Sequence, residues 1–247
     1  MKKLFLLTLF GLLTTVSANA QRVTDKLDRG VVAVPMNNGG YLVTWRRYGS
    51  EYYDTKYNLY RNGSIVATNL DNTNYTVANG SSTDKYEVEA VMRGVVQAKS
   101  PAVQAWSQQY LEVKVQDVVN RNGEKQANAT TNGDSNTPGY ILNDVSLADV
   151  DGDGVAEFIV KRNNVKGNLT AGDNKTDFNL YECYKMDGTR LWWIDLGPNL
   201  MAGPDEQWDM IGYDWDCDGK AEVVMRAADN MIIHTKGGKT INICTMN

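Results

Sequence analysis

From Val31 onward, apolar and polar residues alternate in short runs that are separated by turn-forming residues. This period of two is typical of β-strands, and none of the runs has the period of an amphipathic helix. Asn-Gly pairs stand between runs at 38–39 and 62–63, where a tight hairpin needs positive φ angles. In the first part of the chain the pattern predicts strands at residues 31–34, 41–46, 57–61, 65–67, 74–77, 85–92 and 95–99.

So dense a series of short strands predicts an antiparallel β-sandwich of the fibronectin type III or immunoglobulin-like kind over residues 21–106. We expect Trp45 and Tyr86 in its core, because buried aromatic side chains are common there; sugar stacking is the alternative role for Trp45. A polar bridge at 104–109 places the domain boundary near residue 106. An alternating run at 110–115 predicts the first strand of the next domain.

The second domain, residues 107–247, contains an internal repeat. One aspartate-rich turn begins at Asp149 and another at Asp214, 65 residues later, and each leads into an apolar strand. The other features of the repeat are strands predicted at 158–161, 181–186, 191–196 and 223–226. A unit of several strands that recurs at this period predicts blades of a β-propeller, of which the segment would hold about two. The predicted fold class is all-β, a sandwich followed by an incomplete propeller.

Each aspartate-rich turn has carboxylates at its positions 1, 3, 5 and 9 and a glycine at position 6. Such turns suit a hard cation with six to eight oxygen ligands, and calcium is the expected cofactor because magnesium rarely accepts so complete a protein shell. A main-chain carbonyl at position 7 would add to the carboxylates. The predicted ligands are Asp149, Asp151, Asp153, Val155 and Glu157 in the first turn and Asp214, Asp216, Asp218, Lys220 and Glu222 in the second.

A strand follows each turn, whereas an EF-hand loop lies between helices. The turns are therefore of the kind found in propeller blades, and we expect their calcium to be structural; a catalytic metal, which keeps an open position, is the alternative. Without a cation the crowded carboxylates repel one another, so the turns should be disordered or partly protonated. Cys217 occupies position 4 of the second turn, where a side chain is expected to point away from the ion.

The first twenty residues predict a secretory signal peptide. Lys2 and Lys3 precede an apolar run at 4–16, and Ala18-Asn19-Ala20 follows as a cleavage pattern. The run is short for a membrane anchor, although an uncleaved anchor is the alternative. The mature protein is thus expected to be periplasmic, cell-surface or secreted, and not in the membrane.

Charge and the counts of cysteine and histidine exclude several classes of partner and site. A formal net charge of −5 argues against nucleic acid as a partner. The chain is expected to be a monomer. Three widely spaced cysteines define no disulfide framework. His234 is the single histidine, so a Ser-His site or a multi-histidine metal site is excluded. We expect His234 to be a solvated strand residue, with a general base as the alternative.

Together these segments resemble the rhamnogalacturonan lyases of polysaccharide lyase family 11, which degrade the pectin backbone. The segments that carry the resemblance are 25–34 (DKLDRGVVAV), 43–46 (VTWR), 57–63 (YNLYRNG), 143–154 (NDVSLADVDGDG), 186–192 (MDGTRLW) and 194–197 (IDLG). The resemblance implies a small β-sandwich followed by an eight-bladed propeller with several calcium ions. It also implies cleavage of rhamnogalacturonan I, a pectic polysaccharide, by β-elimination.

Two segments depart from the family's pattern. After Lys161 the family has a tryptophan, an aspartate and a calcium loop, but this chain continues as 162–167 (RNNVKG), so the metal site there is not expected. The family's Ala-His-Tyr-Thr stretch is replaced at 203–208 (GPDEQW), so substrate handling is expected to differ. Since two blades cannot close a propeller, the catalytic base is expected beyond Asn247 and no catalytic residue is assigned.

Two functions stay open at this point. The first is a rhamnogalacturonan lyase, or its truncated and inactive N-terminal portion. The second is a non-catalytic, calcium-stabilised β-protein that binds glycans or another protein at the cell surface. A dockerin-like adhesion module is excluded by the strands that follow the turns and by the 65-residue spacing.

Overall fold

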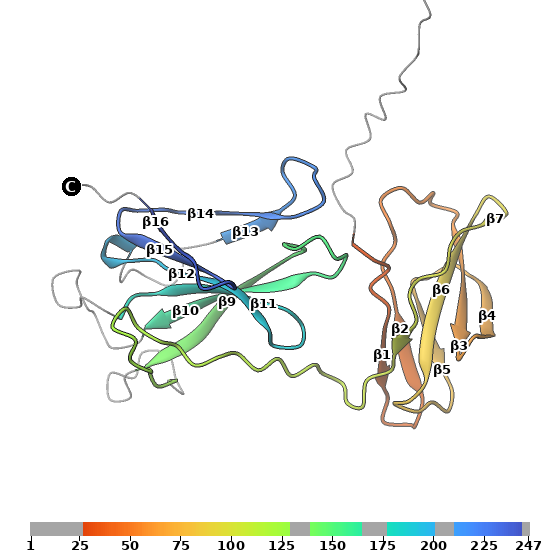
Figure 1. Cartoon of the computed structure of the whole chain (residues 1–247). Coiled ribbons are helices and arrows are strands. Elements are labelled where there is room, and N and C mark those ends of the chain that lie inside the picture. Colours follow the sequence, from red (N-terminus) through yellow and green to blue (C-terminus); the bar gives the residue numbers. More distant parts are fainter. Residues whose placement is uncertain (1–26, 129–138, 165–176, 201–209, 244–247) are drawn as a thin grey trace, which may run out of the picture.

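The computed structural model describes residues 27–128, 139–164, 177–200 and 210–243 (Figure 1). The predicted signal peptide, Cys244 and the departure at 203–208 lie outside these residues. The described chain is all-β, as predicted, with a sandwich drawn in warm colours and a second sheet body in green to blue. Among the described residues, no helix has the length and hydrophobicity needed to cross a bilayer.

Two sheets make up the sandwich, one with the order β1-β2-β5 and one with the order β4-β3-β6-β7, and β8 pairs with β6. Their apolar faces enclose a core that includes Val43, Leu59 and Tyr86, each fully buried. Trp45 also lies in this core, edge-on to Tyr57, which confirms the predicted burial of both Trp45 and Tyr86. The strands are β1 (Val32–Pro35), β2 (Tyr41–Thr44), β3 (Lys56–Arg61), β4 (Ser64–Leu70), β5 (Asn74–Val77), β6 (Lys85–Met92), β7 (Val95–Val96) and β8 (Val103–Gln104).

The strand predicted at 110–115 is wrong. This segment is extended and joins the two bodies without pairing in a sheet (Figure 1). It crosses the end of the second body instead, where the carbonyl of Lys114 approaches Gly188 and the amide of Gln116 donates to the Tyr184 hydroxyl at 3.1 Å. This segment is thus held by contacts with side chains and a turn, and not by hydrogen bonds to a neighbouring strand. Its alternating pattern correctly predicted an extended backbone but not whether that backbone pairs in a sheet.

The second body contains a six-stranded antiparallel sheet with the order β16-β15-β12-β11-β10-β9 and a separate β13-β14 pair. The β13-β14 pair packs on the larger sheet around a core that includes Ile159, Cys183 and Leu196, all fully buried. The elements are β9 (Tyr140–Ala148), β10 (Glu157–Asn164), β11 (Leu180–Tyr184), β12 (Arg190–Asp195), the single 3-10 turn η1 (Pro198–Leu200), β13 (Met210–Tyr213), β14 (Glu222–Met225), β15 (Met231–Thr235) and β16 (Thr240–Ile243).

The internal repeat is visible as two series of four strands, β9 to β12 and β13 to β16, each with an acidic turn after its first strand. The first series forms a continuous antiparallel meander. The second series is divided, because β15 pairs with β12 instead of β14. The described sheets are therefore open, and the closed propeller with about two blades from this chain stays a prediction.

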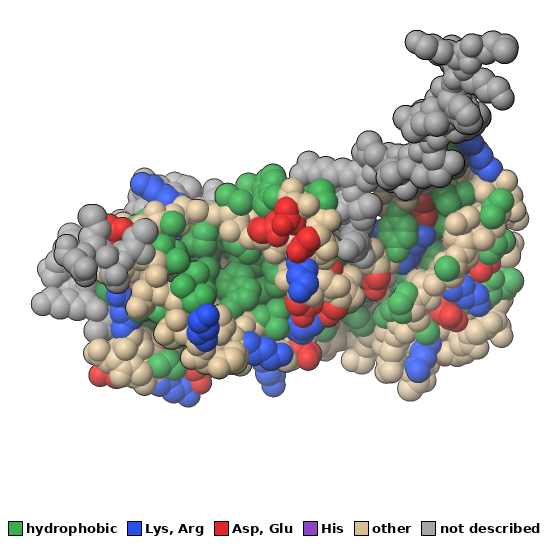
Figure 2. All heavy atoms as spheres, turned by 45° about the horizontal axis from the view of Figure 1, so that its top comes forward, with side chains coloured by type: hydrophobic (Ala, Val, Ile, Leu, Met, Phe, Trp, Pro, Cys, Tyr) green, Lys and Arg blue, Asp and Glu red, His purple; other side chains and the backbone are tan. Residues whose placement is uncertain are grey.

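Where the second series divides, an apolar groove of about 650 Å³ lies between β14 and the β12-β15-β16 part of the sheet. Its walls include Trp192 and Ile194 on one side and Val223 and Met225 on the other. In the space-filling view, apolar side chains gather in a hollow on this body, and acidic side chains gather beside it (Figure 2).

Candidate metal centres

The first aspartate-rich turn joins β9 to β10. The carboxylate of Asp149 accepts hydrogen bonds from the amides of Gly152, Asp153 and Gly154 at 2.7, 3.1 and 2.9 Å. Glu157, at the start of β10, accepts from the amide of Val150 at 2.8 Å. Aspartate favours such turns because its side chain bonds the amides that follow it, so the sequence itself bends the turn and aims its carboxylates inward.

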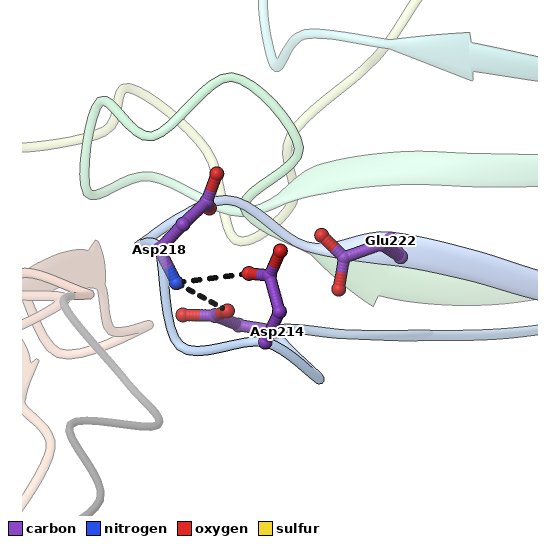
Figure 3. Close-up of side chains that lie close together, drawn as sticks. Asp214, Asp218 and Glu222 are labelled. Carbon is purple, nitrogen blue, oxygen red and sulfur yellow. Dashed lines mark hydrogen bonds between the residues drawn. The ribbon is translucent and has the colours of Figure 1, made fainter.

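The second turn joins β13 to β14 and repeats this arrangement. The carboxylate of Asp214 accepts from the amides of Asp218 and Gly219 at 3.1 and 3.0 Å, and Glu222 accepts from the amide of Trp215 at 2.8 Å. Figure 3 shows the side chains of Asp214, Asp218 and Glu222 gathered around this bend. The same spacing therefore produces the same local structure in both turns.

The oxygen atoms in each turn lie close enough to share one cation. Asp214, Asp216, Asp218 and Glu222 each offer a carboxylate oxygen, and these four atoms lie within 4.8 Å of one another. Oxygen ligands of calcium stand about 2.3–2.6 Å from the ion, so two ligands on opposite sides are about 5 Å apart at most. The donor set is made of hard oxygen atoms and fits calcium. Ligation by the carbonyls of Val155 and Lys220 stays a prediction.

The first turn differs in its surroundings. Asp149, Asp151 and Asp153 converge within the same 4.8 Å limit, but Glu157 does not join that cluster and is only 1% exposed. The ammonium nitrogen of Lys185 lies 2.6 Å from an oxygen of Asp151 and 2.6 Å from an oxygen of Asp153. A protein cation thus neutralises part of the first turn in this structure.

The charges in the first turn influence one another's titration. The pKa of Glu157 is raised to about 7, chiefly by burial and in smaller part by the negative charges of Asp151 and Asp153, while the hydrogen bond from the Val150 amide lowers it. The hydrogen bond from Lys185 lowers the pKa of Asp153, and its bonds to both aspartates raise the pKa of Lys185. Glu157 is the most buried of the acidic groups in the turn, and its raised pKa agrees with the prediction that a metal-free turn is partly protonated.

Sequence reasoning did not include Lys185 in the site. This residue follows β11, far from the aspartates in sequence, and forms the base of the turn that leads to β12. Thr235 holds the equivalent place in the hairpin between β15 and β16, since the two residues make the same turn hydrogen bonds. Only the arrangement of strands brings Lys185 to the first turn, so no local pattern could have revealed it.

Three parts of the chain meet at the first turn. The amide of Ala221, in the second turn, donates to the Asp149 carbonyl at 2.7 Å. The amide of Asp28, which precedes the first strand of the sandwich, donates to the Gly154 carbonyl at 2.8 Å. Gly152 lies against Lys220, whose Cγ would be only 3.0 Å from a β-carbon added there. The two acidic turns are therefore neighbours, and the first also contacts the sandwich domain.

Position 4 of the turns has the same backbone conformation in both copies. Gly152 has a φ of 79° and Cys217 a φ of 65°. Cys217 thus occupies a left-handed position that glycine fills in the first turn. Cys183 and Cys217 are not bonded to one another, and burial raises the pKa of the Cys183 thiol to about 12.

His234 lies on a strand, as predicted, but it is half-buried rather than solvated. It lies on β15 opposite Trp193 of β12, and the two rings stack with centroids 3.6 Å apart and planes 2° apart. Burial lowers the pKa of His234. The neutral imidazole therefore packs as an aromatic group between neighbouring strands.

At the first departure from the family pattern, the chain holds a buried ion pair. Arg162 is 1% exposed, and its Nε donates to Glu182 at 2.7 Å. Glu182 also accepts from Arg190, while Arg162 donates to the side chain of Asn128 and the carbonyl of Gln116. Arg162 thus ties the segment between the two bodies to β10 and β11, a structural role in place of an aromatic residue.

Comparisons with known proteins agree with this architecture. A family model described as the rhamnogalacturonan I lyases beta-sheet domain matches residues 22–106. A second, described as the rhamnogalacturonan lyase family 11 C-terminal domain, matches residues 110–243, more than half of the chain.

The curated relatives include two proteins of Bacillus subtilis. The rhamnogalacturonan endolyase YesW is 41% identical over 212 residues, and the rhamnogalacturonan exolyase YesX is 35% identical over 211 residues. Each alignment covers 85% of this chain but only 32% or 33% of the relative. The chain therefore spans about a third of the length of these relatives.

Solved structures give the same result. The crystal structure of YesW matches with a TM-score of 0.70 and 36% identity over 89% of this chain and 36% of that chain. A Bacillus licheniformis rhamnogalacturonan lyase matches with a TM-score of 0.70 and 34% identity over 91% of this chain and 36% of that chain. Fold, acidic turns and sequence matches lead to one conclusion: the chain belongs to rhamnogalacturonan lyase family 11.

Proposed function

We propose that this chain is the N-terminal part of a calcium-stabilised lyase that cleaves rhamnogalacturonan I. The observation that carries the proposal is the match of residues 110–243 to the family model, over the segment in which both acidic turns fold alike. The named activities of YesW and YesX, one an endolyase and one an exolyase, support the same substrate class.

The reaction is a β-elimination. A base removes the proton beside the galacturonate carboxylate, the electron pair forms a carbon–carbon double bond, and the bond to the rhamnosyl oxygen breaks. The departing oxygen takes up a proton, so the products are an unsaturated uronate and a free rhamnosyl hydroxyl. A divalent cation on the substrate carboxylate would make the proton beside that carboxylate easier to remove. No described residue of this chain is assigned as the base.

In this proposal the residues described above build the scaffold rather than the reaction centre. The carboxylates of Asp214, Asp216, Asp218 and Glu222 would hold one calcium ion, and those of the first turn would hold another. Each ion neutralises a tight group of negative charges and fixes the connection between two strands. Such fixed connections fit successive blades of a propeller, with β9 to β12 as the first and β13 to β16 as the second.

The N-terminal sequence supports an exported protein. Lys2, Lys3 and the apolar run that follows have the pattern of a signal peptide, and pectic polysaccharides are polymers that must be attacked outside the cytoplasm. Protein recovered with its first twenty residues intact from the cytoplasmic fraction would contradict this part of the proposal.

The test is the formation of unsaturated uronate, followed by its ultraviolet absorbance, when rhamnogalacturonan I is mixed with the complete gene product and calcium. We expect an increase that chelation abolishes. A complete gene product that retains the polymer but forms no unsaturated product would support the alternative of a non-catalytic glycan-binding protein.

A further inference from the structure

An aromatic and cationic surface lies at one end of the sandwich domain. The connection from β2 to β3 carries Tyr52, which is 45% exposed, and Tyr53, which is 91% exposed. The turn from β6 to β7 lies at the same end of the domain and carries Arg93 (Figure 1). The guanidinium carbon of Arg93 stands 3.8 Å from the centre of the Tyr52 ring. Two separate connections thus combine into one surface.

The connection that carries Tyr52 and Tyr53 is held in place by the buried carboxylate of Glu51. Glu51 forms an ion pair with Arg29 at 2.6 Å, and the two side chains are only 2% and 5% exposed. Glu51 also accepts hydrogen bonds from the Tyr57 hydroxyl at 2.7 Å and from the Tyr48 amide at 3.0 Å. Both oxygens of this buried carboxylate have partners, and these contacts fix the conformation of the connection. Tyr52 and Tyr53 are therefore exposed in a preorganised geometry.

Arg93 is held in an unfavourable backbone conformation. Its φ is 49°, and Gly94 follows with a φ of 82°. The hairpin between β3 and β4 makes the same kind of turn with Asn62 and Gly63, at φ 51° and 79°. Asparagine tolerates this left-handed region far better than arginine. Strained residues are common at functional sites, so the outlier at Arg93 is a reason to test its side chain for a function.

The exposed guanidinium groups on this surface favour the binding of an anion. Arg47 donates a hydrogen bond to the Tyr52 carbonyl and is exposed, as is Arg93. Among the described residues, neither guanidinium forms an ion pair with a carboxylate. The connection also contains Asp54, whose exposed carboxylate is its one acidic group besides the buried Glu51. Two unneutralised guanidinium groups therefore flank the tyrosines.

We propose that Arg47, Tyr52, Tyr53 and Arg93 bind an acidic polysaccharide, with sugar rings against the tyrosines and uronate carboxylates on the guanidinium groups. Flat aromatic rings accept the apolar faces of sugars, and guanidinium groups bind carboxylates through paired hydrogen bonds. The choice of a uronate polymer rests on the proposed function.

The experiment is affinity electrophoresis of the whole chain in gels that contain rhamnogalacturonan I, polygalacturonate or neutral galactan. A chelator is present throughout, so that calcium bridging between protein and polymer is excluded. We expect the two acidic polymers to retard the chain, less strongly at high ionic strength. Retardation by neutral galactan as strong as by the acidic polymers would overturn the proposal.

Two variants test the residues. Arg93→Asn should weaken the affinity about tenfold, because a charge-assisted hydrogen bond is lost, while it keeps or raises the melting temperature, because asparagine suits the turn. Tyr53→Ala removes a side chain that is 91% exposed and should weaken binding with no loss of stability. Tyr110→Ala removes another exposed tyrosine, 62% exposed and outside the surface, and is the matched control. Unchanged retardation of Arg93→Asn would overturn the proposal.

The complete gene product is assayed in parallel, with calcium, for unsaturated uronate. Product formation by the complete gene product, together with a wild-type chain that is not retarded, would overturn this surface and leave the proposed lyase. Retardation of the chain that depends on Arg93, together with a complete gene product that forms no unsaturated uronate, would support this surface and remove the lyase.

Discussion

The turn that begins at Asp149 and the turn that begins at Asp214 share a sequence pattern and backbone hydrogen bonds, yet their neighbours differ. In the first, Glu157 is buried and Lys185 binds two of the aspartates. In the second, Glu222 is exposed and completes a cluster of four carboxylates. Local sequence therefore determines the bend, while tertiary structure determines how much negative charge remains for a cation.

This difference gives the two turns distinct expected behaviour. The second turn brings four carboxylate oxygens together, whereas in the first turn a calcium ion would have to displace Lys185, and Glu157 would have to lose its proton. Metal binding to a site with protonated ligands releases protons and depends on pH. Calcium should therefore bind the second turn more tightly near neutral pH.

The largest effect is expected from removal of the first aspartate of each turn. Asp149 accepts three main-chain hydrogen bonds and Asp214 accepts two. Asp149→Ala should lower the free energy of unfolding by about 3 kcal/mol, and Asp214→Ala by about 2 kcal/mol, because buried amides lose a charged acceptor. Denaturant unfolding in a chelator measures both, and an equal or reversed effect would contradict the comparison.

The next effect concerns pH. Burial raises the folded-state pKa of Glu157 to about 7 from its ordinary value of 4.5, so the fold favours the protonated form. Its contribution to stability is full below pH 4.5 and is lost as the pH rises through about 7. Without metal, the free energy of unfolding should fall by about 2 kcal/mol over this range.

Unfolding curves of the wild-type chain and of Glu157→Gln, recorded across this range in a chelator, measure the loss. The variant should lack it, and Glu222→Gln, the matched change in the exposed turn, should retain it. Stability that rises between pH 4.5 and 7 and depends on Glu157 would show the opposite sign. Calcium should reverse the trend, because it needs the ionised carboxylate.

A smaller change is expected from Lys185→Met. This substitution removes the ammonium that competes with a cation for Asp151 and Asp153, so calcium should bind the first turn a few-fold more tightly. Calorimetric titration in an Asp216→Ala background isolates this site. Thr235→Met, at the equivalent place in the second series, is the control and should have no effect. Weaker calcium binding after loss of Lys185 would mean that the lysine supports the site.

The smallest effect is expected at position 4 of the second turn. Cys217 has a left-handed φ of 65°, where Gly152 stands in the first turn. Cys217→Gly should raise the free energy of unfolding by up to about 1 kcal/mol, because the relief of steric strain exceeds the added entropy of the unfolded chain. Thermal unfolding under reducing conditions measures the change. A lower melting temperature would show that the thiol contributes packing that outweighs the strain.

Sequence patterns predicted the sandwich closely where the strands are local hairpins. The predicted strands at 74–77 and 85–92 have the bounds of β5 and β6. Both lie between turn-forming residues. The apolar side chains alternate toward the core in β5 and at Tyr86, Val88 and Ala90 of β6, where Glu89 is buried as well. The acidic turns were predicted for a similar reason, since each is bent by hydrogen bonds within nine residues.

The pairing of strands that are distant in sequence could not be predicted from the sequence pattern. The alternation at 110–115 did not reveal that no neighbouring strand is there, and the repeat did not reveal that β15 pairs with β12. The contact between Lys185 and Asp151 and the stacking of Trp193 on His234 depend on that arrangement of strands. In each case the decisive partner is distant in sequence and is chosen by packing, which no local period encodes.

The first turn is hydrogen-bonded to both of its neighbours. Its carbonyls at Asp149 and Gly154 accept hydrogen bonds from the second turn and from the segment that enters the sandwich. An ion bound in this turn would stabilise both attachments, so we expect metal binding to couple the unfolding of the two domains. After chelation that cooperativity would be lost, and calorimetry would record two separate transitions in place of one.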